Sequence, residues 1–191
     1  MTESGYTPED QIKNSEQQNR HTIDVKKVDE DEFFNTKDML ETGGDLQTIE
    51  VGKWIETNLQ TPVANTGAAY CVEIYAVSPQ KNRLIVGHFP ETQGETGQSE
   101  ELQNSVNEYK SMLNTIKKAS EEDKNIEVYL FGQDHTGTKY ELDKRSALSK
   151  QIMQSGVEPN NLIDERVVTP GATDSTLFDP IAKAILHKRA Y

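Results

Sequence analysis

Two apolar runs joined by a short polar turn constrain the fold of this chain more than any other feature. Residues 71–77 and 83–89 are rich in β-branched and aromatic side chains, and residues 78–82 between them have the composition of a turn. We therefore expect a β-hairpin. Because side chains alternate along a strand, Cys71 would share a face with Glu73 and Tyr75.

The remaining pattern predicts a mixture of helices and strands. Apolar residues at helical spacing follow Ser99, which predicts a helix over residues 100–119, and a second helix is expected from Ser146 toward Gly156. A strand with a bend at Gly52 is expected over 48–55, and further strands are expected at 126–131 and 162–168. The last segment fits either a helix over 179–188 or a hairpin turn whose second strand covers 184–188. This order of elements predicts an α+β fold in which β-sheets pack against flanking helices.

Charge divides the chain into two parts. Residues 1–46 carry 12 acidic and 5 basic residues, which gives a net charge of −7 out of −12 for the whole chain. Their only large apolar cluster is Phe33–Phe34, too little apolar surface to offset the entropy of ordering. We therefore expect a disordered acidic N-terminal extension over 1–46 and a single α+β domain over 47–191.

Composition also argues against several classes of function. No run approaches the roughly 20 apolar residues of a membrane span, and the first residues lack the pattern of a secretory signal, so no membrane insertion is expected. No cluster of Lys and Arg is present, which argues against nucleic-acid binding. A single cysteine fits a reducing, cytoplasmic compartment.

The strongest candidate for chemistry is the pair formed by Cys71 and His88. Cys71 is the only thiol, and His88 lies at the same end of the predicted hairpin, where it can act as the base that a thiol nucleophile requires. Gly67 and Gly87 would leave room for backbone to approach a substrate. A lone cysteine in a strand is more often a small buried apolar residue, and this alternative stays open.

The other histidines carry weaker signals. His135 lies in a glycine-flanked loop after a strand, where it and Gln133 would form part of the rim of a site. His21 and His187 lie near the two ends of the sequence. No histidine spacing typical of a metal site and no glycine fingerprint for phosphate appears, so neither a metal nor a cofactor is expected.

Taken in order, several segments resemble the chemoreceptor glutamine deamidases, the CheD family of cysteine hydrolases. Residues 51–54 read Val-Gly-Lys-Trp, residues 65–71 read Asn-Thr-Gly-Ala-Ala-Tyr-Cys, and His88 follows Cys71 by 17 positions within Gly-His-Phe. Leu-Phe-Gly-Gln at 130–133 and Phe-Asp-Pro at 178–180 continue the resemblance, which covers roughly residues 48–189. The family's closing hairpin favours a strand over a helix at 179–188.

The resemblance implies a mechanism. Cys71 would attack the side-chain amide or ester of a glutamine or methylglutamate, and His88 would act as base. Asn65 or Thr66 would stand in for the family's assisting threonine and orient His88, while backbone amides around Tyr70 and Cys71 would stabilise the oxyanion. The chain departs from the family where Asn65 replaces that threonine, Ala69 a glycine and Tyr70 a serine.

Three functions follow from these observations. The first is a cysteine-dependent amidohydrolase, without metal or cofactor, that deamidates a glutamine of a protein substrate, either in the cytoplasm or in a host cytosol after export. The second is a regulatory binding module that keeps the CheD-like fold without the chemistry, as the altered positions 65, 69 and 70 suggest. The third is a structural protein in which Cys71 is inert.

Overall fold

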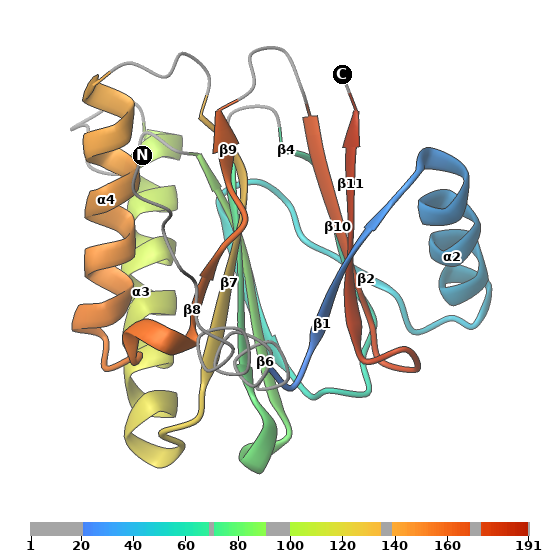
Figure 1. The fold of residues 1–191 in the computed structure, drawn as a ribbon, viewed down its shortest axis with the longest axis horizontal. Helices are drawn as coiled ribbons and strands as arrows, with labels where there is room; N and C mark the ends of the chain where they lie inside the picture. Colours follow the sequence, from blue (N-terminus) through green and yellow to red (C-terminus); the bar gives the residue numbers. More distant parts are fainter. Residues whose placement is uncertain (1–20, 69–70, 91–99, 135–138, 169–172, 191) are drawn as a thin grey trace, which may run out of the picture.

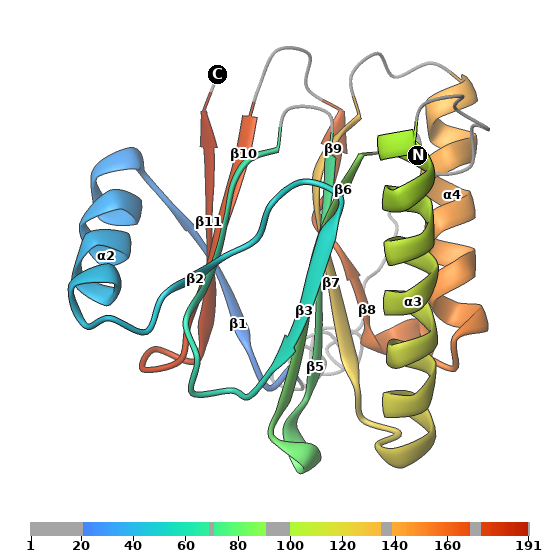
Figure 2. The ribbon, with the colours of Figure 1, turned by 180° about the vertical axis from the view of Figure 1, so that it is seen from behind.

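Two β-sheets stack face to face between helices. The computed structural model describes residues 21–68, 71–90, 100–134, 139–168 and 173–190. Helices α3 (Glu100–Glu122) and α4 (Lys139–Gln154) cover the outer face of one sheet, and α2 (Glu30–Thr42) covers the outer face of the other (Figures 1 and 2). The expected α+β class is confirmed.

The first sheet, which we call sheet A, has the strand order β1-β11-β10-β4-β2. Its strands are β1 (Asp24–Val28), β2 (Gln47–Thr48), β4 (Val63–Ala68), β10 (Thr173–Asp179) and β11 (Ala184–Ala190). β10 and β11 form an antiparallel hairpin, and β1 runs parallel to β11. The strand expected at the C-terminal end, in preference to a helix, is therefore confirmed.

The second sheet, sheet B, has the order β3-β6-β5-β7-β8, with β9 also paired to β7. Its strands are β3 (Lys53–Thr57), β5 (Cys71–Ser78), β6 (Arg83–Pro90), β7 (Glu127–Asp134), β8 (Leu162–Asp164) and β9 (Val167–Val168). β5 and β6 are the expected hairpin, joined by the single 3-10 turn Pro79–Lys81, and a second such turn, Pro159–Asn161, precedes β8.

Three apolar clusters hold the four layers together. Ile74, Met112 and Ile116 lie in the cluster between sheet B and its helices, and Tyr75, Val86 and Phe178 lie in the cluster between the sheets. The third cluster joins α2 to sheet A. Each large apolar side chain buried in this way contributes about 1.5–3 kcal/mol to folding. Because Ile74 and Tyr75 of β5 point to opposite faces of sheet B, this strand contributes to both of the clusters that adjoin the sheet.

The expected disorder over 1–46 is wrong for residues 24–42, which form β1 and α2. The charged side chains of α2 lie mostly on its exposed face, while Phe33 and Leu40 are buried against sheet A. Asp29 caps the helix by accepting a hydrogen bond from the amide of Glu32 (2.8 Å), and acidic residues in the first turn favour the helix dipole. The average composition of the segment did not reveal that Phe33 and Leu40 lie on the one face of the helix that packs against sheet A. Residues 1–20 lie outside the described part of the chain.

Other boundaries differ in detail. The first expected helix is confirmed as α3, whereas α4 begins at Lys139, seven positions before Ser146. The single strand expected to bend at Gly52 is only partly observed. Of residues 48–51 only Thr48 lies in a strand, β2, whereas residues 53–55 lie in β3 of the other sheet, and Gly52 between them has φ 81°. Among the described helices, none combines the length and apolar character required to cross a bilayer.

Candidate functional site

Cys71 and His88 lie on the same face of sheet B, turned toward sheet A. Cys71 is opposite Pro90 in the β5–β6 pairing, and Glu73 is opposite His88. Cys71 and His88 are therefore diagonal neighbours, at a spacing of about 7–8 Å between backbones. Cys71 is half-buried, and His88 is 1% exposed. The structure thus brings the two sequence-predicted residues to one end of the space between the sheets.

His88 is buried and uncharged. Burial lowers the pKa of its imidazole, and the nearby backbone of Ile49 offsets part of this effect. Within the described part of the chain, neither ring nitrogen lies in hydrogen-bonding geometry with a partner. The ring is therefore uncharged at neutral pH, and its nitrogens are not hydrogen-bonded to Cys71 in this state. Catalytic hydrogen bonds are often long before substrate binds.

Gly132 fixes the backbone that carries Cys71. It lies opposite Val72 in the β5–β7 pairing and has φ 124°, a conformation that favours glycine. A Cβ atom added there would overlap the carbonyl oxygen of Cys71. The amide of Gly132 donates to Asp174 Oδ2 on sheet A (3.1 Å). The glycine noticed within Leu-Phe-Gly-Gln therefore has a positional role beside Cys71.

Asn65 and Thr66 do not hold His88 in this structure. Asn65 is buried on β4, and its Nδ2 donates to the hydroxyl of Tyr75 (3.3 Å), while its Oδ1 has no partner among the described residues. Thr66 is exposed. The orienting role expected of one of these residues is not met by a hydrogen bond, because alternation along β4 turns Thr66 away and Tyr75 takes the amide of Asn65.

The remaining sequence-predicted residues are less informative. Tyr70 and His135 lie outside the described residues, and Gln133 is described only as a backbone position of β7, paired with Val167. Gly87 does not leave room for a substrate. A Cβ atom there would overlap the sulfur of Met112 on α3, so this glycine allows the helix to approach sheet B.

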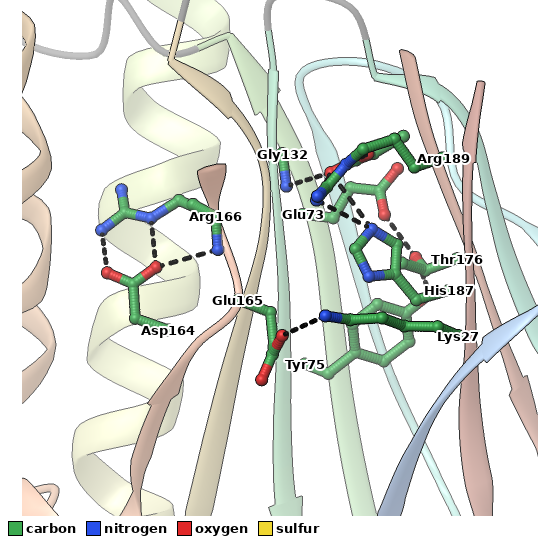
Figure 3. Close-up of polar contacts among 11 residues, drawn as sticks. Lys27, Glu73, Tyr75, Gly132, Asp164, Glu165, Arg166, Thr176, His187 and Arg189 are labelled. Atoms are coloured by element: carbon green, nitrogen blue, oxygen red, sulfur yellow. Dashed lines mark hydrogen bonds and ion pairs between the residues drawn. The ribbon is translucent and has the colours of Figure 1, made fainter. Parts of the chain in front are cut away.

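A buried polar cluster, which sequence reasoning missed, fills the space between the sheets beside His88. Glu73 and Tyr75 of β5 face Thr176 of β10 (Figure 3). The hydroxyl of Thr176 donates to Glu73 Oε2 and lies 2.7 Å from the hydroxyl of Tyr75. Burial raises the pKa of Glu73 to about 8, the hydrogen bond from Thr176 lowers it in part, and the charge of Asp174 raises it. The carboxyl group is therefore largely neutral at pH 7.

A second group of charged residues adjoins this cluster. Asp174 lies 3.2 Å from His187 Nε2 and accepts two hydrogen bonds from Arg189, at 2.9 and 3.2 Å. Burial would raise the pKa of Asp174, but the hydrogen bonds from His187 and Arg189 outweigh it and hold the pKa below its ordinary value. The signal was available: in the expected C-terminal hairpin, these residues alternate onto one face.

The cluster is not arranged as a metal centre. Within the described residues, no three His, Cys, Asp or Glu side chains come together in a way that could hold a metal ion. The arrangement combines a half-buried thiol, a neutral imidazole diagonally across from it on the neighbouring strand, and a largely neutral carboxyl group opposite that imidazole. These are the components of proton transfer from a thiol to a base.

Comparison with known proteins gives general likeness only. No protein-family model and no curated protein matches the sequence. Three solved structures are similar to parts of it: YfiH of Bacillus licheniformis (11% identity, 62% of this chain, 51% of that chain, TM-score 0.40), YlmD of Geobacillus stearothermophilus (14%, 64%, 59%, 0.40) and the C-terminal domain of CNFy of Yersinia pseudotuberculosis (10%, 65%, 47%, 0.31). The matches span about half of those chains, and none of them bears on activity.

Proposed function

We propose that this protein is a cysteine-dependent amidohydrolase that deamidates a glutamine side chain of a protein substrate. The observation that carries the proposal is the placement of Cys71 and His88 on one face of the β5–β6 hairpin, where His88 lies two residues from Pro90, the residue opposite Cys71. The thiol is half-buried and the imidazole is buried and uncharged, which suits a nucleophile and its base.

The proposed reaction has two steps. The proton of Cys71 Sγ moves to His88, and the thiolate attacks the carboxamide carbon of the substrate. The carbon–nitrogen bond breaks, His88 returns the proton to the leaving group as ammonia departs, and a thioester remains. His88 then activates water, which hydrolyses the thioester to a glutamate side chain and restores the thiol.

Backbone amides near residues 70 and 71 are the proposed oxyanion donors, because a developing negative charge beside the nucleophile needs fixed hydrogen-bond donors. The conformation of Gly132 supports this part of the proposal, since it sets the backbone at Cys71. The relation to the CheD-like hydrolases belongs to the same proposal. It is supported by the interval between Cys71 and His88 and by the order of the strands around them. The protein substrate would be met in the cytoplasm or, after export, in a host cytosol.

One observation favours a second function. Among the described residues, neither nitrogen of His88 is hydrogen-bonded to Cys71 or to an orienting side chain. A protein that keeps this fold as a binding module, with Cys71 as an inert residue, would need no such contact. The reactivity of the thiol separates the two functions, because only the hydrolase requires a thiolate near neutral pH.

The test is the rate at which iodoacetamide labels Cys71 as a function of pH, in the wild type and in His88→Ala. A thiolate supported by His88 should react well below the ordinary thiol pKa of about 8.5, and this advantage should disappear in the variant. His21→Ala is the matched control, because this histidine lies far from Cys71. His21 contacts Glu127, the first residue of β7, whereas Gly132 beside Cys71 lies near the other end of that strand. Slow labelling with an ordinary thiol profile in both proteins would refute the hydrolase and favour the binding module.

A further inference from the structure

The carboxyl group of Glu73 is fully buried at the candidate site, yet the proposed reaction assigns it no role. Its Oε2 accepts the hydrogen bond of Thr176, and its Oε1 has no partner within the described part of the chain. Leaving a polar atom buried without a partner destabilises a protein, because the atom loses its hydrogen bonds to water and gains none. Such a group beside a candidate nucleophile and base calls for a functional explanation.

The residue directly opposite Glu73 in the sheet, His88, also has buried polar atoms without hydrogen bonds. Glu73 on β5 lies directly opposite His88 on β6, and both side chains are turned toward sheet A. Directly opposed residues of an antiparallel pair have Cβ atoms about 4.5–5.5 Å apart. Neither nitrogen of His88 has a hydrogen bond of full geometry among the described residues, although the backbone of Ile49 lies close enough to raise its pKa. A change of side-chain rotamer would therefore give one atom of each residue a partner.

We propose that Glu73 is the positioning residue of His88: its Oε1 accepts the N–H of one ring nitrogen and leaves the other nitrogen facing Cys71. The role in supporting Cys71 rests on the proposed function, whereas the pairing of Glu73 with His88 does not. Asn65 and Thr66, which the sequence suggested for this role, are occupied by Tyr75 or exposed.

The proton balance follows from this geometry. When the proton of Cys71 Sγ moves to the nitrogen facing it, a thiolate and an imidazolium form, and the opposite N–H stays bound to Glu73. The positive ring favours ionisation of Glu73, and the ionised carboxylate in turn raises the pKa of His88. The two groups therefore titrate as a coupled pair.

In the arrangement described, the pKa of His88 is set by burial, which lowers it, and by the backbone of Ile49, which raises it, so the coupling to Glu73 would arise in the proposed rotamer. The titratable or charged groups around the pair are Lys53, opposite His88 in the β3–β6 pairing, Tyr75 on the same strand as Glu73, and Asp174, which lies beside His187 and Arg189. Lys53 is exposed and its ammonium lies 3.5 Å from Glu108, whereas Asp174, which lies beside Arg189, still raises the pKa of Glu73 through its charge. Thr176 is the tuning group, since its hydroxyl favours the ionised form of Glu73.

The experiment follows the ring nitrogens of His88 by NMR in the full-length protein labelled with ¹⁵N-histidine and ¹³C-glutamate, across pH, in the wild type and Glu73→Gln. We expect the wild-type ring to hold one tautomer and to titrate with an inflection shared by the Glu73 carboxyl carbon. In Glu73→Gln, which cannot become charged, the His88 pKa should fall by about one unit or more. Thr176→Val should shift it in the same direction by less. Glu127→Gln, a buried carboxyl elsewhere in sheet B, should leave it unchanged.

Labelling of Cys71 measured on the same proteins separates the two proposals. If Cys71 labels as an ordinary thiol in the wild type while Glu73→Gln shifts His88, the hydrolase fails and the pair stands. If labelling is fast and depends on His88, but both labelling and the His88 titration are unchanged in Glu73→Gln, the positioning role is wrong and the hydrolase stands. The signal of His187 reports whether the variant is folded. Should Glu73→Gln not fold, independent titrations of Glu73 and His88 in the wild type would overturn the pair.

Discussion

Asp174 of β10 accepts a hydrogen bond from the backbone amide of Gly132 on β7, at 3.1 Å, and so joins sheet A to sheet B beside Cys71. The same carboxylate also binds Arg189 and His187. A buried anion is tolerated here because several donors surround it. Asp174 therefore joins the two sheets at the candidate site, together with the hydrogen bonds of Thr176 to Glu73 and of Asn65 to Tyr75.

Replacing Asp174 should destabilise the protein strongly. Asp174→Ala leaves Arg189, His187 and the Gly132 amide without their acceptor, and breaking a buried ion pair in this way costs about 3–5 kcal/mol. The measurement is urea unfolding at pH 7, with the exposed Asp38→Asn on α2 as control, for which a change within about 0.5 kcal/mol is expected. A loss from Asp174→Ala no larger than that of the control would contradict this prediction.

The contribution of Asp174 should also depend on pH. Because its pKa is held below the ordinary value in the folded protein, its stabilising effect is present above the unfolded-state pKa of about 3.9 and is lost as pH falls through the folded-state pKa. The difference in unfolding free energy between the wild type and Asp174→Asn should therefore shrink below about pH 4. A difference that stays constant into acid would show that charge is not involved.

Alanine at Gly132 should disturb Cys71 in particular. The added Cβ would overlap the carbonyl oxygen of Cys71, and the alanine would have to adopt φ 124°. Both backbone strain and a displacement of Cys71 are therefore expected. Gly44→Ala is the matched control, since Gly44 also has positive φ (85°) but a Cβ atom added there would meet no heavy atom within 4 Å. We expect the Gly132 variant to lose more stability than the control, which should lose about 1 kcal/mol, and to label at Cys71 with altered kinetics. Equal effects at the two glycines would refute the positional role.

Glu73 should make the protein less stable as pH rises. Its folded-state pKa of about 8 exceeds the value of about 4.3 in an unfolded chain, so the folded state holds a proton that the unfolded state has lost. Between about pH 5 and pH 8, the unfolding free energy of the wild type should fall relative to Glu73→Gln, by at most about 1.4 kcal/mol per pH unit. Thermal unfolding of both proteins across this range measures the difference. A difference that does not vary with pH would mean that Glu73 is ionised throughout.

Helix α2 should be an integral part of the fold. Phe33 is fully buried against sheet A, and the ammonium of Lys188 lies 4.4 Å from the ring centroid of Phe34. Phe33→Ala should cost about 3–5 kcal/mol, as for other buried aromatic residues. Phe34 is 40% exposed, so Phe34→Ala should cost much less and serves as the control. If unfolding in urea gave the two variants equal stability, α2 would contribute little to folding.

The sequence predicted well where one local pattern decides the outcome. Alternation over residues 71–89 and helical spacing after Ser99 led to the observed hairpin and α3, and placed Cys71 and His88 at the same strand ends. It failed where contacts come from distant segments. The place of Glu73 beside Thr176 depends on how two sheets stack, and alternation alone says which face a residue takes but not what lies across from it.

The N-terminal segment shows the other limit. Its acidic composition suggested disorder because averages weigh every residue equally, whereas folding of α2 depends on Phe33 and Leu40 at positions that face sheet A. His187 carried only a weak signal near the end of the sequence, yet alternation along β11 buries it between the sheets while Lys188 faces α2.

The parallel pairing of β1 with β11 has a practical consequence for anyone shortening the chain. A polypeptide that began at Gln47 would keep every residue of the candidate site but would leave the backbone donors and acceptors along one side of β11 open to solvent. An uncovered strand of this kind recruits strands from other molecules. Such a shortened protein should self-associate and precipitate even with its chemistry intact, so its inactivity would say nothing about Cys71.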